Sequence, residues 1–424
     1  MKQNKLSFGN LRVMKALVPP FYFLIAVLFA CNPPTNSSGP ITINPDNFER
    51  HLQEILITAD SGTVIELPEG RFEITRTLSL DGIHGLTIKG QGRQKTVVSF
   101  KQQIQGAEGM SIKANDITLQ GFAIEDSKGD GLKLLDSRGV ILRDLGVSWT
   151  NGADSTNGGY GIYPVSCQKL LIEDCEASFA SDAGIYVGQC TDVVIRDNLA
   201  HHNVTGIEIE NSRNVDCYHN LARDNSGGIL IFNLPDLPQP FGYNVRVHEN
   251  FSQNNNFQNF SPKGAMVNTV PPGTGMLVVA HKDLEIFNNS ITGHKTVGLG
   301  VISYLFTGRP FNSNNGFEPF YYNVNIHDNS FERLQDGTTD QSTEFGQIIS
   351  TLFQGQPQDI LIDGIFHPEY GIDRSICLQN NGEDLRFTNL NAGLAENPED
   401  MARSLNQDLQ VFECTLPPIE VEGL

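Results

Sequence analysis

Three carboxylic acids and two tyrosines recur at intervals that would bring them together in a regular repeat. Tyr163, Tyr186 and Glu208 follow one another at about 22 residues, Asp182 shortly precedes Tyr186, and Glu210 shortly follows Glu208. Tyrosine rings pack on the apolar faces of sugars, and carboxylates bind hydroxyl groups or Ca²⁺. These side chains predict a sugar-binding groove, with Glu208 and Glu210 as ligands if Ca²⁺ binds. The alternative is a solvated sheet face with two exposed tyrosines.

Two further patterns are candidates for catalysis. In an extended strand Glu208 and Glu210 point to the same side, ~7 Å apart, which is compatible with a two-carboxylate hydrolytic pair. His202 and Arg223 follow strands in consecutive units, where they would supply a base and an arginine to a polysaccharide lyase. The alternative for His202 and Arg223 is that they are solvated turn residues.

The element that must position these residues is a repeat of about 22 residues. Each unit begins with glycine and alternating apolar residues, as in Gly184-Ile-Tyr-Val and Gly206-Ile-Glu-Ile. This period of two indicates β-strands, and no segment between the strands has helical periodicity. Equal coils of short strands must stack to bury their apolar faces. A second strand in each unit usually ends in an asparagine, and these asparagines should form a ladder from coil to coil: Asn198, Asn220, Asn250, Asn289 and Asn329.

The unit Gly-Ile-x-Ile … Val-x-Ile-x-Asp-Asn resembles the repeat of right-handed parallel β-helix proteins of the pectate-lyase-like superfamily, over roughly residues 60–395. The resemblance implies an all-β fold, a single-stranded right-handed parallel β-helix or solenoid. It implies no single activity, because the superfamily contains lyases, hydrolases, epimerases, adhesins and proteins without known catalysis.

The segment Tyr160-Gly-Ile-Tyr-Pro-Val is similar to the YGFDPH motif of mannuronan C5-epimerases. Tyr163 and Val165 stand where that motif has its acid and its histidine, so proton transfer at C5 by those two groups is not expected. The resemblance therefore supports the fold and argues against that mechanism. Only Tyr160 carries over, as a candidate acid.

Both ends of the repeat should be capped. Asn44-Pro45 predicts the start of a short helix whose apolar face, formed by Phe48, Leu52, Ile55 and Leu56, closes the first coil. We assign residues 44–395 to the β-helix with this cap and residues 396–424 to a C-terminal cap and tail. Long insertions at residues 150–159, 233–241 and 254–263 should wall the tyrosine and glutamate face.

Cysteine use is compatible with an oxidising compartment. Cys377 and Cys414 flank the last coil and could close it with a disulfide. Cys167 and Cys190 occupy equivalent positions in adjacent coils, where either a disulfide or an interior stack of thiols is sterically allowed.

The first 30 residues form a positively charged segment followed by an apolar run, which is the layout of a secretory signal. Leu28-Phe-Ala-Cys31 resembles a bacterial lipobox, which implies cleavage before Cys31 and a lipid anchor on its thiol. Residues 31–43 then form a tether. Asn32 after the cysteine favours the outer membrane, so we expect an exported, lipid-anchored protein.

The net charge limits the partners. The formal charge is −20, and loss of the leader removes four of 29 basic residues and no acid, leaving −24. Such a surface repels nucleic acid and anionic headgroups. Three functions remain open: a polysaccharide-binding envelope lipoprotein, a lyase or epimerase acting on glycans that contain uronate, and a structural or accessory protein with an envelope protein partner.

Overall fold

The computed structural model describes residues 39–312, 315–334, 337–395 and 398–421. The expected leader, Cys31 and most of the expected tether lie outside these described residues. No helix in the described part of the chain is both long and apolar enough to cross a membrane.

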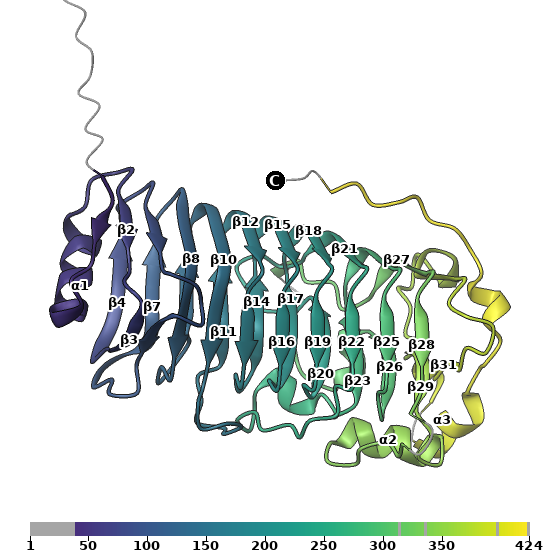
Figure 1. The fold of residues 1–424 in the computed structure, drawn as a ribbon. Coiled ribbons are helices and arrows are strands. Elements are labelled where there is room, and N and C mark those ends of the chain that lie inside the picture. Colours follow the sequence, from purple (N-terminus) through teal and green to yellow (C-terminus); the bar gives the residue numbers. More distant parts are fainter. Residues whose placement is uncertain (1–38, 313–314, 335–336, 396–397, 422–424) are drawn as a thin grey trace, which may run out of the picture. The chain divides into compact units, whose positions relative to one another are not determined.

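Residues from Gly39 onward wind into stacked coils of parallel strands (Figure 1). One sheet, sheet B, has 11 strands. The other, sheet A, has 20 strands, and its pairings follow two rows. Three rows of parallel strands joined by short turns and loops confirm the predicted all-β parallel β-helix.

The strands have the following bounds. Sheet B contains β4 (Arg76–Asp81), β7 (Gln105–Lys113), β9 (Leu132–Leu135), β11 (Tyr160–Val165), β14 (Ala183–Gly188), β17 (Thr205–Glu210), β20 (Gly227–Phe232), β23 (Thr274–Val279), β26 (Val297–Ile302), β29 (Gln358–Ile362) and β31 (Phe387–Asn389). The first row of sheet A contains β1 (Ile41–Thr42), β2 (Val64–Glu66), β5 (Thr87–Lys89), β8 (Ile117–Glu125), β10 (Arg138–Ser148), β12 (Gln168–Glu173), β15 (Thr191–Arg196), β18 (Arg213–Tyr218), β21 (Tyr243–His248), β24 (Lys282–Phe287), β27 (Tyr322–His327) and β30 (Ile376–Gln379). The second row contains β3 (Gly70–Glu73), β6 (Thr96–Ser99), β13 (Glu176–Ser178), β16 (Leu199–His201), β19 (Leu221–Arg223), β22 (Phe251–Gln253), β25 (Ser290–Thr292) and β28 (Ser330–Glu332), and the long strands β8 and β10 belong to both rows.

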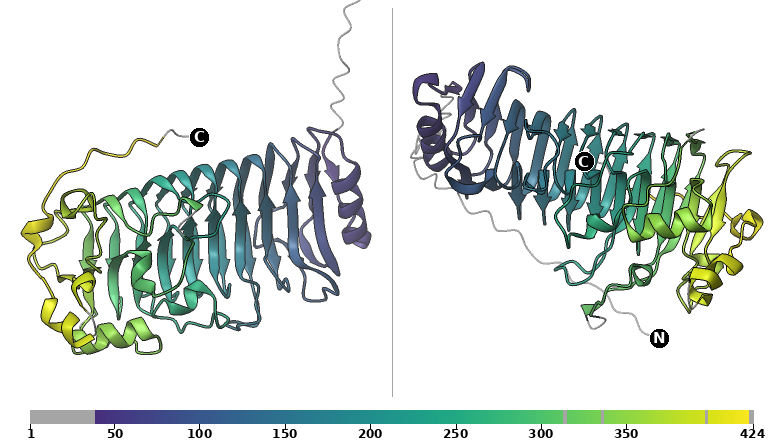
Figure 2. Two further views of the ribbon diagram at one scale, coloured as in Figure 1. Left: turned by 180° about the vertical axis from the view of Figure 1, so that it is seen from behind. Right: turned by 90° about the horizontal axis from the view of Figure 1, so that it is seen from below.

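Helices lie at the ends of the stack and in the loops. The α-helices are α1 (Phe48–Thr58), α2 (Glu344–Leu352) and α3 (Pro398–Ser404). The short 3₁₀ turns are η1 (Pro45–Asn47), η2 (Met266–Thr269), η3 (Tyr304–Thr307), η5 (Ile372–Arg374), η6 (Ala392–Leu394) and η7 (Leu409–Phe412). In Figure 2 the teal and green coils carry long loops, whereas most turns of the purple and blue coils are short.

The register places like residues on like residues. Ile185 pairs with Ile207 and Ile207 with Ile229, so one coil is one repeat. These side chains point into the core and are fully buried. Burial of one apolar face of every strand is the main favourable term that stacks the coils.

The predicted asparagine ladder is present. Asn198 donates through Nδ2 to Asn220 Oδ1 at 2.9 Å, and the same bond recurs from Asn220 to Asn250 and from Asn250 to Asn289. It continues through Asn329 to Asn381. Because these amides are buried, each bond satisfies a group that would otherwise destabilise the fold.

The two ends are closed as expected. Helix α1 buries Phe48, Leu52, Ile55 and Leu56 against the first coils, which confirms the predicted cap. A disulfide joins Cys377 to Cys414 at the other end. The remaining cysteines of the described chain are free and buried, so Cys167 and Cys190 form no disulfide.

Beyond this disulfide the chain turns back along the first row of sheet A (Figure 1, yellow). The backbone N–H of Ile419 donates to Glu285 at 3.1 Å. Residues 416–420 and the sheet together line a cleft of about 430 Å³. We call residues 415–421 the C-terminal strap.

Candidate functional site

The outward side chains of sheet B change from exposed to buried along the stack. Paired positions form two parallel rows, whose members in coil order are Ser79, Ser111, Lys133, Tyr163, Tyr186, Glu208, Leu230 and Leu277, and Asp81, Lys113, Leu135, Val165, Gly188, Glu210, Phe232 and Val279. Outward residues from β4 to β11 are exposed or half-buried, and those from β14 onward are buried. We call the part formed by β4, β7, β9 and β11 the open face.

A second hydrophobic cluster covers the buried part. Its members on the sheet include Leu230, Phe232, Leu277 and Val279, and they pack against apolar residues of long loops. The loop members are Leu234, Phe257, Phe260, Ala265, Met266, Val267, Val270, Tyr304, Phe306, Phe311 and Phe317. We call the segments 233–242, 254–273, 303–312 and 315–321 the loop cover. Ala153, in the insertion at 150–159, also packs against this cluster.

Three tyrosines lie where the open face ends. The rings of Tyr160 and Tyr163 stack with centroids 4.2 Å apart and planes inclined by 5°. The ring of Tyr186 contacts both, at 4.7 Å and 5.0 Å. A Cβ added at Gly188 would lie 2.2 Å from the Tyr186 hydroxyl oxygen, so only glycine leaves room for this ring position.

Three carboxyl groups lie beside these rings without a cation. Glu210 accepts hydrogen bonds from the Tyr186 hydroxyl at 2.7 Å and from Gln189 at 3.2 Å. The Tyr160 hydroxyl donates to Asp182 at 3.4 Å. Glu208 is 2% exposed, and its Oε2 has no hydrogen-bond partner, nor has Asp182 Oδ1. We call Tyr160, Tyr163, Asp182, Tyr186, Glu208 and Glu210 the tyrosine–carboxyl cluster.

Burial without a cation raises the pKa of every acid in this cluster. Desolvation, with the Glu210 carboxylate second, raises the pKa of Asp182 to about 7. Desolvation and the charge of Asp182 raise the pKa of Glu208 well above its ordinary value. Desolvation also raises the pKa of Glu210, although bonds from Tyr186 and Gln189 oppose it. Perturbed acids of this kind concentrate at functional sites.

One cation lies next to the cluster, on the open face. Lys133 Nζ is 3.3 Å from Glu108 and 3.7 Å from Asp130. It also lies 5.4 Å from the centroid of the Tyr163 ring. Lys133 pairs with these outer acids and forms no ion pair with Asp182, Glu208 or Glu210.

The carboxylate side chains of the cluster are not arranged as the ligands of a metal ion. Within the described ranges, no group of three or more His, Cys, Asp or Glu side chains is placed so that it could hold a metal ion. Glu210 already accepts two hydrogen bonds through the same oxygen. The expectation that Glu208 and Glu210 ligate Ca²⁺ therefore has no support in this arrangement.

The expected residues lie close together, but they are more buried than the sequence predicted. Tyr163, Tyr186, Glu208 and Glu210 do follow one another on the outward rows. Neither an open groove over all of them nor a solvated face is correct, because Tyr186 is only 4% exposed and Glu210 only 8%. The physical reason is the loop cover, whose apolar side chains exclude water beyond β11.

His202 and Arg223 lie apart from the cluster. His202 contacts His201, Phe179 and Phe257, and burial followed by the charge of His201 lowers its pKa. Arg223 pairs with its neighbour Asp224 at 2.6 Å. No hydrogen bond, ion pair or ring contact joins either residue to the tyrosine–carboxyl cluster, so the structure does not assemble the expected base and arginine there.

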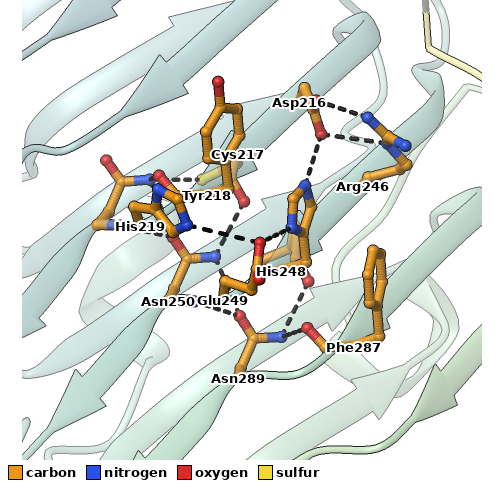
Figure 3. A network of polar contacts seen from close by, with 12 residues as sticks. Asp216, Cys217, Tyr218, His219, Arg246, His248, Glu249, Asn250, Phe287 and Asn289 are labelled. Atoms are coloured by element: carbon orange, nitrogen blue, oxygen red, sulfur yellow. Dashed lines mark hydrogen bonds and ion pairs between the residues drawn. The ribbon is translucent and has the colours of Figure 1, made fainter.

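The outer face of sheet A holds a second polar network, which sequence patterns did not single out (Figure 3). Asp216 binds Arg246 at 2.6 Å and His248 at 3.0 Å, and Glu249 lies between His248 and His219. Burial would raise the pKa of Asp216, but the bonds from His248 and Arg246 lower it. Because every acid here has a partner, this network fits a stabilising role.

Several residues that lie next to the tyrosine–carboxyl cluster were also not identified from the sequence. Gln189, Asp130 and Glu108 contact the cluster or Lys133. The register gives a signal for Lys133 alone, since it precedes Tyr163 in the same outward row. Gln189 and Asp130 lie just outside strands β14 and β9, and Glu108 lies where the register between β4 and β7 shifts, so the alternation of side chains does not fix their direction.

Comparison with known proteins identifies a fold. The sequence matches the family described as "Right handed beta helix region" over residues 73–233 and again over 154–307. No curated protein matches the sequence.

Solved structures with similar folds include the A-module of mannuronan C-5 epimerase AlgE4 from Azotobacter vinelandii. It is 14% identical with a TM-score of 0.49, over 83% of this chain and 95% of that chain. An alginate lyase from Paenibacillus sp. is 12% identical with a TM-score of 0.42, over 70% and 95%. An exopolygalacturonase from Thermotoga maritima is 14% identical with a TM-score of 0.44, over 69% and 85%. Similarity at such low sequence identity gives no information about activity.

Proposed function

The chain belongs to the right-handed β-helix family, and on that premise we propose that it is a polysaccharide-binding member whose sugar site is the open face next to the tyrosine–carboxyl cluster. One observation carries this proposal. Glu208 and Glu210 are buried and Asp182 is half-buried, and no cation pairs with them where the exposed surface ends. Such an arrangement destabilises the fold and suggests a functional reason for its presence.

The chemistry of the site suits a sugar. The half-buried carboxyl group of Asp182, with its pKa raised to about 7, holds a proton for part of the time near neutral pH and can donate a hydrogen bond to a hydroxyl oxygen. Tyr163 is half-buried and offers part of its ring to the apolar face of a sugar. Lys133, one repeat earlier, adds a charged donor on the open face.

A binding experiment with matched variants tests the proposal. Affinity electrophoresis of residues 39–424 in gels with alginate, polygalacturonate, mannan or dextran should show retardation by at least one glycan. Tyr163→Ala should abolish the retardation. Tyr243→Ala should not, because Tyr243 is also a half-buried tyrosine but lies on sheet A, packed against Arg213. Unretarded wild-type protein in all four gels, or equal loss in both variants, contradicts the proposal.

A specific observation favours a second candidate function, acid-catalysed cleavage of a glycan. The carboxyl group of Asp182 has a pKa of about 7 and is bonded to the Tyr160 hydroxyl, so it can hold and deliver a proton near neutral pH. New reducing ends should then appear on incubation with the retained glycan, and Asp182→Asn should remove them without loss of retardation. A rise in absorbance at the wavelength of unsaturated uronates would indicate a lyase instead.

The location of the protein is a separate proposal. It is supported by the resemblance of residues 28–31 to a lipobox, and it places the β-helix on the cell envelope through a lipid on Cys31. In a bacterial host, Cys31→Ala should move the protein from the membrane fraction to the soluble fraction. Unchanged fractionation would rule out anchoring through this thiol.

A further inference from the structure

We infer that the site takes the end of a glycan chain and not an interior segment. This inference rests on the proposed function and adds the part of the polymer that is recognised. The evidence is the direction of the two outward rows of sheet B and the position, beyond β11, at which the loop cover buries them.

The open face gives a glycan one direction in which to lie. Its outward residues follow the stacking direction of the coils, one row position per coil. The four strands β4, β7, β9 and β11 extend on the order of 14 Å along that direction, at ~4.8 Å per strand interval. A short oligosaccharide on this surface would run from exposed Ser79 and Asp81, past Lys113, to Lys133 and Tyr163.

The same direction is blocked beyond Tyr163. The next outward residue, Tyr186, is buried under the rings of Tyr160 and Tyr163. After Glu208 come Leu230 and Leu277, which belong to the second hydrophobic cluster. A chain that continued along the sheet would have to displace the loop cover and expose that cluster to water, which the hydrophobic effect opposes.

A side exit is also restricted. The insertion at 150–159 precedes Tyr160, and its Ala153 packs against the second hydrophobic cluster. Asn157 in this insertion donates to the carbonyl oxygens of Gly152 and Phe179, each at 2.8 Å, which holds the insertion against the next coil. Ser181, next to Asp182, donates back to Asn157 at 2.8 Å. The tyrosine–carboxyl cluster is therefore bounded by the insertion at the starts of its strands and by the loop cover along the stack.

The inference predicts a stoichiometry that can be measured on the unmodified protein. Alginate, polygalacturonate, mannan and dextran are each fractionated into short and long chains, and protein bound per chain is measured by sedimentation or light scattering. An end-binding site gives one protein per chain at both lengths. Interior binding gives a number that rises in proportion to chain length.

The outcomes separate this inference from the proposed function. One protein per chain at both lengths supports it, and blocking the reducing ends by reductive amination then shows which end is bound. Several proteins per long chain would overturn end recognition and leave polysaccharide binding intact. Absence of binding to every fraction would overturn the proposed function and this inference together.

Discussion

Asp182 should make the protein less stable as pH rises, and replacing it should remove that loss. Its pKa is 3.8 in an unperturbed chain and about 7 in the fold, so the folded state holds a proton that the unfolded state has released between these values. Unfolding therefore releases a proton in this window, and stability falls as pH increases from about 4 to about 7. Below the window both states are protonated, and above it the full cost of ionising Asp182 is present.

The size of the effect follows from the pKa difference. Each pKa unit corresponds to about 1.4 kcal/mol, which sets an upper limit of about 4 kcal/mol for Asp182. The side chain is half-buried, so water screens part of this, and we expect about 1–2 kcal/mol. For a folded unit of this size the unfolding entropy is about 0.8 kcal/mol/K, so Tm should change by about 1–3 °C.

The assay compares Tm at pH 5 and pH 8.5 for wild type, Asp182→Asn and a control. Asp182→Asn should lose about 1–3 °C less than wild type between the two pH values, because all other titrating groups are shared. Asp60→Asn is the control, since Asp60 is exposed and its side chain has no bonded partner, and it should follow wild type. Equal pH dependence in wild type and Asp182→Asn would refute the account of Asp182 as a half-buried acid whose pKa is raised because no cation pairs with it.

Three other changes test separate parts of the structure. Asn250→Ala removes a ladder amide that donates hydrogen bonds to Cys217 and Asn289. In urea titrations it should lower the free energy of unfolding by about 2–4 kcal/mol. The control Asn47→Ala should not, because Asn47 is exposed. Gly188→Ala should displace the Tyr186 ring and reduce glycan retardation at least tenfold while far-ultraviolet circular dichroism stays unchanged; full retardation would show that the ring position is not required. Reduction of the Cys377–Cys414 disulfide should make the C-terminal strap at least several-fold more sensitive to limited proteolysis, and equal cleavage rates would show that its contacts with sheet A hold it without the disulfide.

The fold was readable from the sequence because its causes are local and repeated. Glycine, an apolar alternation and an asparagine recur in most units, so Ile185, Ile207 and Ile229 had only one way to share an interior face. The same register put Tyr163, Tyr186 and Glu208 in one row. The N-terminal helix was predicted for the same reason, since its apolar face has helical spacing.

The burial of the site was not readable in the same way, because it depends on loops that no repeat describes. The outward row does contain a signal, since Leu230, Phe232, Leu277 and Val279 are apolar where solvent-facing residues would be polar. Which segments cover them depends on contacts such as those of Phe260 and Tyr304, which are distant in sequence. The ionisation of Asp182 and Glu208 depends on that cover, so it could not be inferred from their spacing.

The asparagine ladder also has a consequence for how such a molecule can change over evolutionary time. Each rung bonds to the rung before and after it by the same geometry, so the ladder does not distinguish one coil from the next. Duplication or deletion of one whole coil would preserve every bond type at the junction. The ladder runs from Asn198 to Asn381, so it lies beyond the coils of the open face. Loss or gain of a ladder coil beyond β17 would therefore change the length of the stack in fixed increments and leave the residues of the open face in place.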